Sequence, residues 1–369
     1  MKKIYYITAV FATLFLVGCG DGIDLPGVNV ETDLNKIPLP DNNVNLEQVE
    51  LKPSTEPMLH EGLHTEEDFQ RIRDKKAAGE EPWISAYQLL VESQFSQKTA
   101  DTYPTEWIKR GVSGDENYMN AARGATIAYQ QALRWKIEQD DEYAAKAVEN
   151  LNKWVQTCVG VTGNTNLSLA AGLYGYEFAI AGELLRDYGG WDRADFAAFQ
   201  NWLLKVFYPA NDDFLKRHHD TNALHYWANW CLCNIAAKMA IGIVTDRRDI
   251  YNEGIAHLQT GDTNGRLRRA IYHDYAPDYN FAQWQESGRD QGHTLMCVGL
   301  MGVICQLAWS QGDDFFAYDD NLFLRACEYA ACCNYTNETV PYTTYIWQKQ
   351  SQWGLSLIHI SEPTRLRCI

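Results

Sequence analysis

Residues 117–137, NYMNAARGATIAYQQALRWKI, and residues 142–157, EYAAKAVENLNKWVQT, decide the fold class. In the first stretch small apolar residues recur at the spacing of one helix face; they are Ala121, Ala125, Ala128 and Ala132. The second stretch repeats the pattern with Tyr143, Ala147, Leu151 and Trp154. Two amphipathic helices joined by a short connector predict an antiparallel pair.

The same helical periodicity extends along most of the chain. Further helices are expected near residues 168–187, 194–207, 222–244, 247–259, 293–311 and 321–334. Connectors rich in Gly, Asn and Asp separate them, and strand signals are few. We therefore predict an all-α domain of antiparallel helix pairs. Because no fixed-period repeat is visible, a closed α/α toroid is favoured over an open solenoid.

The N-terminal residues resemble a bacterial lipoprotein signal. Lys2 and Lys3 precede an apolar run from Ile4 to Val17, and Leu16-Val17-Gly18-Cys19 resembles a lipobox. We expect a signal peptide at residues 1–18, lipid on Cys19 and a flexible tether at residues 19–57. The alternative, a transmembrane anchor, needs roughly 20 apolar residues. The expected location is outside the cytoplasm, with membrane contact only through this lipid, on the periplasmic face or the outer-membrane surface.

Residues 355–365, LSLIHISEPTR, resemble the translation of a transposon-based sequencing adapter. We therefore expect the natural sequence to end near Gly354 and exclude residues 355–369 from the interpretation of the fold. The helical domain is then expected at residues 58–354, as a toroid that lacks its last helices.

The composition excludes some partners. A formal net charge of −16 argues against nucleic acid as a ligand. A polyanionic substrate would need a local basic cleft; the candidates are Lys216, Arg217, His218, His219, Arg266, Arg268, Arg269 and Arg289. Ten cysteines include no pair with zinc-ligand spacing, so no metal and no other cofactor is predicted.

Three stretches carry candidate chemistry. They are His225-Tyr226-Trp227-Ala228-Asn229-Trp230, the block from Gln285 to Thr294 (QESGRDQGHT), and Ala308-Trp309-Ser310-Gln311-Gly312-Asp313-Asp314. With Glu328-Tyr329 further on, they resemble the alginate lyase family, a group of α/α-toroid polysaccharide lyases. The block around Arg289 is the most specific part of this resemblance, whereas Cys231 and Cys233 depart from it. The resemblance implies an enzyme that cleaves alginate or a related polyuronate by β-elimination.

Such a reaction removes the C5 proton of a uronate and expels the C4 oxygen. The neighbouring carboxylate must be neutralised, and Arg289 and Asn229 suit that role because both donate hydrogen bonds. His225 or His293 is a candidate base, and Tyr226 a candidate base or acid. Each residue also has a structural interpretation: an ion pair for Arg289, and core packing for His225 and Tyr226.

Further residues are candidates for substrate binding. They are Trp227, Trp230, Trp284, Glu286, Arg217 and His219. Trp227 is as well explained by core packing, and Glu286 and Asp290 by orienting their neighbours. Two rival functions remain at this point. A glycoside hydrolase would use two carboxylates chosen from Glu286, Asp290, Asp313 and Asp314. A surface lipoprotein that only binds glycans would need aromatic side chains but no Arg, His and Asn group.

Overall fold

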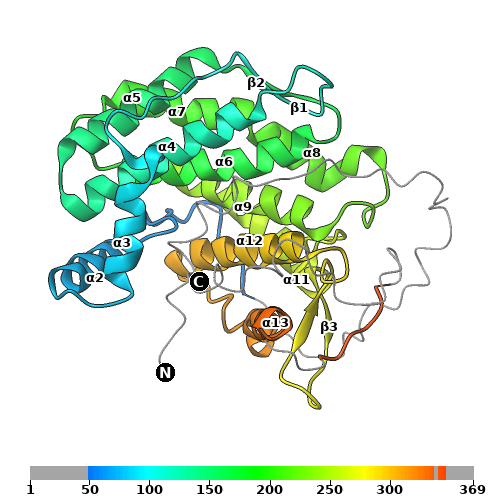
Figure 1. Cartoon of the computed structure of the whole chain (residues 1–369). Helices are drawn as coiled ribbons and strands as arrows, with labels where there is room; N and C mark the ends of the chain where they lie inside the picture. The colour runs from blue at the N-terminus through cyan, green and yellow to red at the C-terminus, as the bar shows by residue number, and fades with distance from the viewer. Residues whose placement is uncertain (1–48, 336–339, 346–369) are drawn as a thin grey trace. The chain divides into compact units, whose positions relative to one another are not determined.

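A computed structural model describes residues 49–335 and 340–345. The predicted signal peptide, Cys19, most of the tether and residues 355–369 lie outside this part of the chain. The helices are α2 (Glu66–Ala77), α3 (Trp83–Glu92), α4 (Tyr118–Glu138), α5 (Asp141–Thr157), α6 (Leu167–Leu184), α7 (Arg193–Val206), α8 (Tyr208–Arg217), α9 (Ala228–Val244), α10 (Arg248–Thr260), α11 (Leu267–Ala270), α12 (Gln291–Ser310) and α13 (Tyr318–Tyr335) (Figure 1). Short 3-10 turns, η2 (Gln94–Ser96) and η3 (His218–Asp220), join some of them.

The described chain forms two compact units. Unit 2 comprises Val49–Leu267 and Leu300–Phe315, and unit 1 contains Arg268–Gly299 and the residues from Phe316 onward. Each has one small sheet: β1 (Trp107–Arg110) pairs in parallel with β2 (Gly160–Gly163), and β3 (Ile271–Asp274) pairs antiparallel with β4 (Ala282–Trp284). Helix α12 begins in unit 1 and ends in unit 2.

Helices α6 and α9 form the core of unit 2. They run parallel, because Asn234 of α9 donates to the carbonyl of Ser168 at the start of α6 (3.1 Å), and Arg186, just after α6, donates to the carbonyl of Val244 at the end of α9 (2.9 Å). All 17 residues of α9 are buried, as expected of a helix whose residues are mostly apolar. Helix α5 packs on α4, and α10 packs on α9.

Several helices begin where the sequence supplies a cap. Thr65 and Asp68 form a reciprocal capping box at α2, and the carboxylates of Asp140 and Asp192 cap α5 and α7. The predicted helix at 222–244 was wrong at its start, since α9 begins only at Ala228. Asn222 instead accepts a hydrogen bond from the Leu224 amide (2.9 Å), which favours a turn. Helix α8 was not predicted from the sequence.

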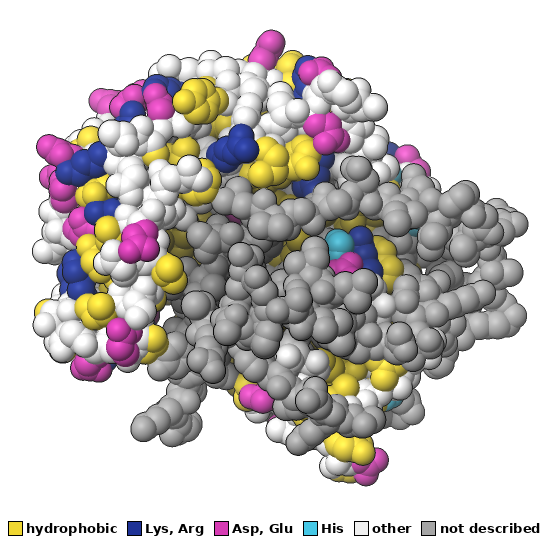
Figure 2. All heavy atoms as spheres, in the orientation of Figure 1, with side chains coloured by type: hydrophobic (Ala, Val, Ile, Leu, Met, Phe, Trp, Pro, Cys, Tyr) yellow, Lys and Arg dark blue, Asp and Glu magenta, His cyan; other side chains and the backbone are white. Residues whose placement is uncertain are grey.

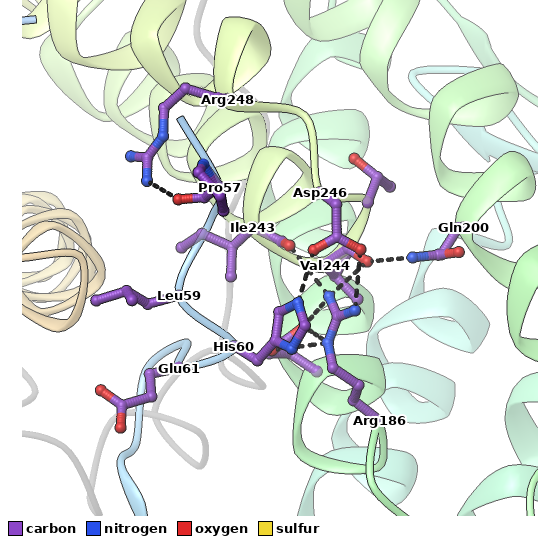
Figure 3. A network of polar contacts seen from close by, with 12 residues as sticks. Pro57, Leu59, His60, Glu61, Arg186, Gln200, Ile243, Val244, Asp246 and Arg248 are labelled. Carbon is purple, nitrogen blue, oxygen red and sulfur yellow. Dashed lines mark hydrogen bonds and ion pairs between the residues drawn. The ribbon is translucent and has the colours of Figure 1, made fainter. Parts of the chain in front are cut away.

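The chain contacts unit 2 from Val49 onward, earlier than the predicted tether boundary at residue 57. Its carbonyls accept from side chains of α10: Val49 from Gln259 (3.0 Å) and Pro57 from Arg248 (2.8 Å). Figure 3 shows the neighbouring network, in which His60 and Arg186 both contact the carboxylate of Asp246. These polar contacts fasten the segment before α2 to the helical core.

Candidate active site

A left-handed turn after α8 positions two histidines of unit 2. His218, His219 and Asp220 have φ values of 48°, 51° and 58°, a conformation that non-glycine residues rarely adopt. Each such residue costs on the order of 1–3 kcal/mol, and such residues concentrate at functional sites. The turn directs His219 to Ser168, with 2.9 Å between Nε2 and Oγ, and His218 to the Cys231 thiol at 3.5 Å.

Aromatic rings surround these histidines. The Phe214 ring lies 4.7 Å from that of His218 and 5.2 Å from that of Tyr226, measured between centroids. Tyr226 in turn lies 5.8 Å from His219 and 4.7 Å from Trp230. We call His218, His219, Tyr226 and Trp230, with Phe214 behind them, the His–Tyr cluster. Its imidazole and phenol groups are the types that transfer protons near neutral pH.

A distant asparagine holds the loop that carries Tyr226. The Asn264 amide donates to the carbonyls of Leu224 (3.2 Å) and Tyr226 (2.8 Å). Asn264 is itself 1% exposed, so these bonds form away from water, where unmade hydrogen bonds are costly. No local motif marks Asn264 in the sequence, and sequence reasoning missed it; the same holds for Ser168.

The candidate residues of this region differ in accessibility. His225 is exposed and packs edge-on against Tyr226, with ring centroids 4.8 Å apart. Tyr226 and Trp230 are buried, Trp227 is half-buried, and Asn229 is 1% exposed in the first turn of α9. The positive end of a helix dipole favours a carboxylate at such a position. The exposed guanidinium of Arg217 forms ion pairs with Asp213 (2.6 Å) and Asp220 (3.0 Å).

Burial keeps the cluster's inner histidine neutral. It lowers the pKa of His218 to about 4, and the nearby His219 and His225 act in the same direction. Burial also lowers the pKa of His219, against the opposing effect of Asp213. A neutral imidazole has a free lone pair, so His219 is available as a hydrogen-bond acceptor at neutral pH.

In unit 1, a buried carboxylate orients Arg289. Glu286 is 0% exposed, and its Oε2 lies 3.0 Å from Nη1 of Arg289, whose side chain keeps 17% of its surface exposed. Cys297 of α12 donates to the other carboxylate oxygen of Glu286 (3.3 Å). The ion pair thus fixes the position of the Arg289 side chain, which remains partly exposed. This agrees with the interpretation of Glu286 as an orienting residue rather than a direct substrate contact.

The residue after Arg289 fixes a histidine. Asp290 accepts from the His293 amide (2.8 Å) at the start of α12, and its second oxygen lies 2.6 Å from His293 Nδ1. Burial alone would raise the pKa of Asp290, but the hydrogen bonds from His293 outweigh burial and hold the pKa below its usual value. A carboxylate at Nδ1 places the imidazole proton there and leaves Nε2 as the acceptor.

Trp284, predicted to bind substrate, is instead a core residue. Its side chain is 0% exposed, its Nε1 donates to the Ala326 carbonyl (3.0 Å), and its ring packs edge-on against Phe323. Neither ring face is open to a sugar, so this prediction was wrong. Sequence alone cannot separate such a buried tryptophan from an exposed one.

Four of the eight candidates for the basic cleft pair with acids: Lys216, Arg217, Arg268 and Arg289. Lys216 contacts Asp212, and Arg268 contacts Asp274 and Asp319. On the face in Figure 2, the described Lys and Arg side chains are interspersed with Asp and Glu. The eight cysteines between Cys158 and Cys333 are free thiols. Within residues 49–335 and 340–345, no group of three or more His, Cys, Asp or Glu side chains is placed to hold a metal ion.

The helical fold and the family match identify the protein as an α-helical polysaccharide lyase. The chain belongs to the alginate lyase family, whose model matches residues 73–338. No curated protein matches it. Asn229 lies in unit 2 and Arg289 in unit 1, and their joint action on one carboxylate stays a prediction.

Solved structures share the fold. A variant of alginate lyase A1-III complexed with a tetrasaccharide is similar with a TM-score of 0.60 and 12% identity, over 82% of this chain and 83% of that one. Alginate lyase A1-III from Sphingomonas species A1 has a TM-score of 0.53 and 13% identity, over 75% and 80% of the two chains. An alginate lyase from Bacteroides ovatus has a TM-score of 0.51 and 14% identity, over 73% and 82%. The predicted all-α toroid fold is confirmed.

Proposed function

We propose that this polysaccharide lyase cleaves alginate or a closely related polyuronate, and that Arg289 neutralises the uronate carboxylate during the reaction. The buried Glu286–Arg289 pair, in a member of the alginate lyase family, carries the proposal. A carboxylate beside the C5 proton makes that proton a poor acid. A preoriented guanidinium stabilises the dianion that forms when the proton leaves, without reorganising at that moment.

His293 is the proposed base. Because Asp290 contacts its Nδ1 at 2.6 Å, the imidazole presents Nε2 with a free lone pair. The C5 proton moves to Nε2, the C4–O bond breaks, and a C4–C5 double bond remains in the new non-reducing sugar. The expelled oxygen takes up a proton as it leaves, and Tyr226, with His219 beside it in the His–Tyr cluster, stays a candidate acid predicted from the sequence.

Asn229 has a complementary role in this proposal. Its amide belongs to the first turn of α9, where backbone N–H groups and the helix dipole favour an anion. An amide is the type of hydrogen-bond donor that a uronate carboxylate requires. Local donors of this kind also explain how a chain of net charge −16 accepts a polyanion.

The product distinguishes this proposal from hydrolysis. The purified protein is incubated with alginate, and the products are followed by ultraviolet absorbance and mass spectrometry. We expect conjugated, unsaturated uronate ends, with product masses that include no added water. Products that carry the mass of one water and do not absorb would identify a hydrolase and overturn the proposal.

Three of the four carboxylates considered for a hydrolase are engaged elsewhere. Glu286 pairs with Arg289, Asp290 binds His293, and Asp313 accepts from Tyr251 (2.8 Å) and contacts Lys52 (3.3 Å). A hydrolase needs one carboxyl group free to donate a proton and one free to act as base or nucleophile. These contacts therefore favour elimination over hydrolysis.

The lipobox-like sequence supports a second proposal, that the enzyme is exported and anchored by lipid on Cys19. We expect Cys19→Ser to move the protein from the membrane fraction to the soluble fraction of the producing bacterium. Unchanged membrane association in the variant would contradict lipid anchoring.

A further inference from the structure

The outer face of the β1–β2 sheet carries an exposed tryptophan. Trp107 is 42% exposed, while Ile108, its neighbour on β1, is fully buried. Alternate residues of a strand point to opposite faces, so Trp107 and Lys109 share the outer face. The flanking residues Tyr103 and Val159 are 73% and 56% exposed. Exposed apolar side chains grouped in this way often mark a binding surface.

The indole of Trp107 packs on a glycine of the neighbouring strand. Gly160 lies opposite Trp107 in the parallel register, and a Cβ placed on it would come within 2.5 Å of an indole carbon of Trp107. The ring therefore lies directly on the Gly160 backbone. An aromatic ring backed by the sheet keeps its other face open and loses little conformational freedom when a ligand stacks on it.

A cation and a hydroxyl continue the same face. Thr162 lies opposite Lys109 in the register, two residues beyond the Trp107–Gly160 pair. The Lys109 amine contacts Asp115 (2.5 Å), but 31% of the lysine side chain and 66% of the Asp115 side chain remain exposed. Such exposed ion pairs contribute little stability, so Lys109 can exchange Asp115 for the carboxylate of a ligand.

Two contacts connect the β1–β2 sheet with the His–Tyr cluster of the same unit. Gly111, directly after β1, packs against the Asn164 side chain: a Cβ on Gly111 would lie 1.9 Å from its Oδ1. Asn164 follows β2, and Ser168, four residues further along the chain, contacts His219 with 2.9 Å between Oγ and Nε2. The sheet and the cluster are therefore linked by a few residues that contact one another.

We propose that the outer face of the β1–β2 sheet, formed by Trp107, Lys109, Gly160 and Thr162, is an additional subsite for the uronate chain, remote from the bond that is cleaved. A sugar ring stacks on the indole, and the carboxylate of a uronate pairs with Lys109. Tryptophan suits the apolar face of a sugar and lysine its negative charge. This inference rests on the proposed function, since it takes the same polysaccharide as ligand.

The test separates long from short substrates. kcat and KM are measured by ultraviolet absorbance on alginate polymer and on the shortest alginate oligosaccharide that the unaltered protein cleaves. We expect Trp107→Ala to raise KM for the polymer about five- to tenfold, with kcat unchanged, because binding contributed equally to ground and transition states is lost. KM for the short oligosaccharide is expected to stay the same, because that substrate does not reach the sheet.

Three further variants sharpen the test. Gly160→Ala is expected to displace the indole and reproduce the effect of Trp107→Ala. Asp115→Asn is expected to release Lys109 and lower KM for the polymer. Tyr279→Ala, which removes an aromatic ring of similar exposure (51%) from unit 1, is the matched control and is expected to leave both KM values unchanged. Circular dichroism melts check that each variant folds.

Affinity electrophoresis in gels that contain alginate gives a readout independent of cleavage. If the unaltered protein yields no unsaturated product yet is retarded more than Trp107→Ala, the proposed function fails and the subsite stands. If it cleaves alginate and Trp107→Ala matches it in KM and in retardation, the subsite is refuted. An equal rise in KM for polymer and short oligosaccharide would also refute it, because the sheet would then not be remote from the cleavage site.

Discussion

The residue 285–293 segment of unit 1 and the His–Tyr cluster of unit 2 hold their reactive groups in opposite ways. In the segment, the two candidate catalytic side chains are each fixed by a partner three residues away: Arg289 by Glu286, and His293 by Asp290. In the cluster, the partners are distant in sequence. His219 meets Ser168 across 51 residues, and Tyr226 is held through Asn264 across 38.

The segment and the cluster also differ in the interactions that stabilise them. The segment relies on ion pairs and a helix cap, which form within one turn of the chain. The cluster relies on three residues with positive φ, closely packed rings and a buried amide. A site of the second kind depends on the whole unit being folded, because the surrounding structure must compensate for the backbone strain. Substitutions in the segment should therefore affect chemistry more than stability, and substitutions that loosen the cluster should affect both.

The largest expected effect comes from Asp290→Asn. Asparagine caps a helix as well as aspartate does, so α12 keeps its start and stability changes little. The amide, however, cannot fix the Nδ1 proton of His293 as the carboxylate does. We expect kcat on alginate to fall roughly 100-fold, the order of loss that misplacement of a catalytic group causes.

Asp290→Ala serves as the companion variant. It should lose the same activity and also lower the free energy of unfolding by about 1 kcal/mol, because the cap is gone. An Asp290→Asn protein with unaltered kcat would show that His293 does not act as the base.

Asn264→Ala tests the cluster. The carbonyls of Leu224 and Tyr226 lose their donor while remaining largely buried, and unmade bonds of this kind cost about 1–3 kcal/mol. We expect the free energy of unfolding to fall by about 2 kcal/mol in urea denaturation, with a drop in kcat/KM from the displaced Tyr226. Asn252→Ala is a suitable control, because that amide donates to the Lys52 carbonyl in another part of the unit. Equal effects of the two substitutions would contradict a special role for Asn264.

The smallest expected effect concerns pH. Burial lowers the pKa of His218 to about 4, whereas an unfolded histidine titrates near 6.5. Between these values the unfolded chain binds more protons than the folded one, so stability falls as pH falls. From about pH 7 to about pH 5, His218 should cost roughly 1–2 kcal/mol of stability.

His218→Phe should reduce this pH dependence, since phenylalanine can pack against Phe214 without titrating. His257 provides a second test: burial also lowers its pKa to about 4, and His257→Leu should act in the same direction. Melting temperatures measured across this pH range check both variants. A slope unchanged by both substitutions would contradict the assignment of buried, neutral histidines.

The comparison also explains what the sequence could predict. The helices and the Glu286, Arg289, Asp290 and His293 contacts follow from spacing of three or four residues, which sequence patterns display directly. The turn at His218–Asp220, the Asn264 amide and the Trp107–Gly160 contact are set by tertiary packing and leave no such pattern. Trp284 was misread for the same reason, because residue type does not reveal whether its ring faces the core.

The most direct test of the role of Arg289 uses two substrates that differ only in charge. Arg289→Ala and the unaltered protein are compared on polyuronate and on the same polyuronate with its carboxyl groups methyl-esterified. An ester has no charge to neutralise, and its neighbouring proton is already more acidic. We expect the variant to lose kcat/KM on the order of 1,000-fold on the free acid but less than about tenfold on the ester. An equal loss on both substrates would show that Arg289 maintains structure rather than neutralising the carboxylate.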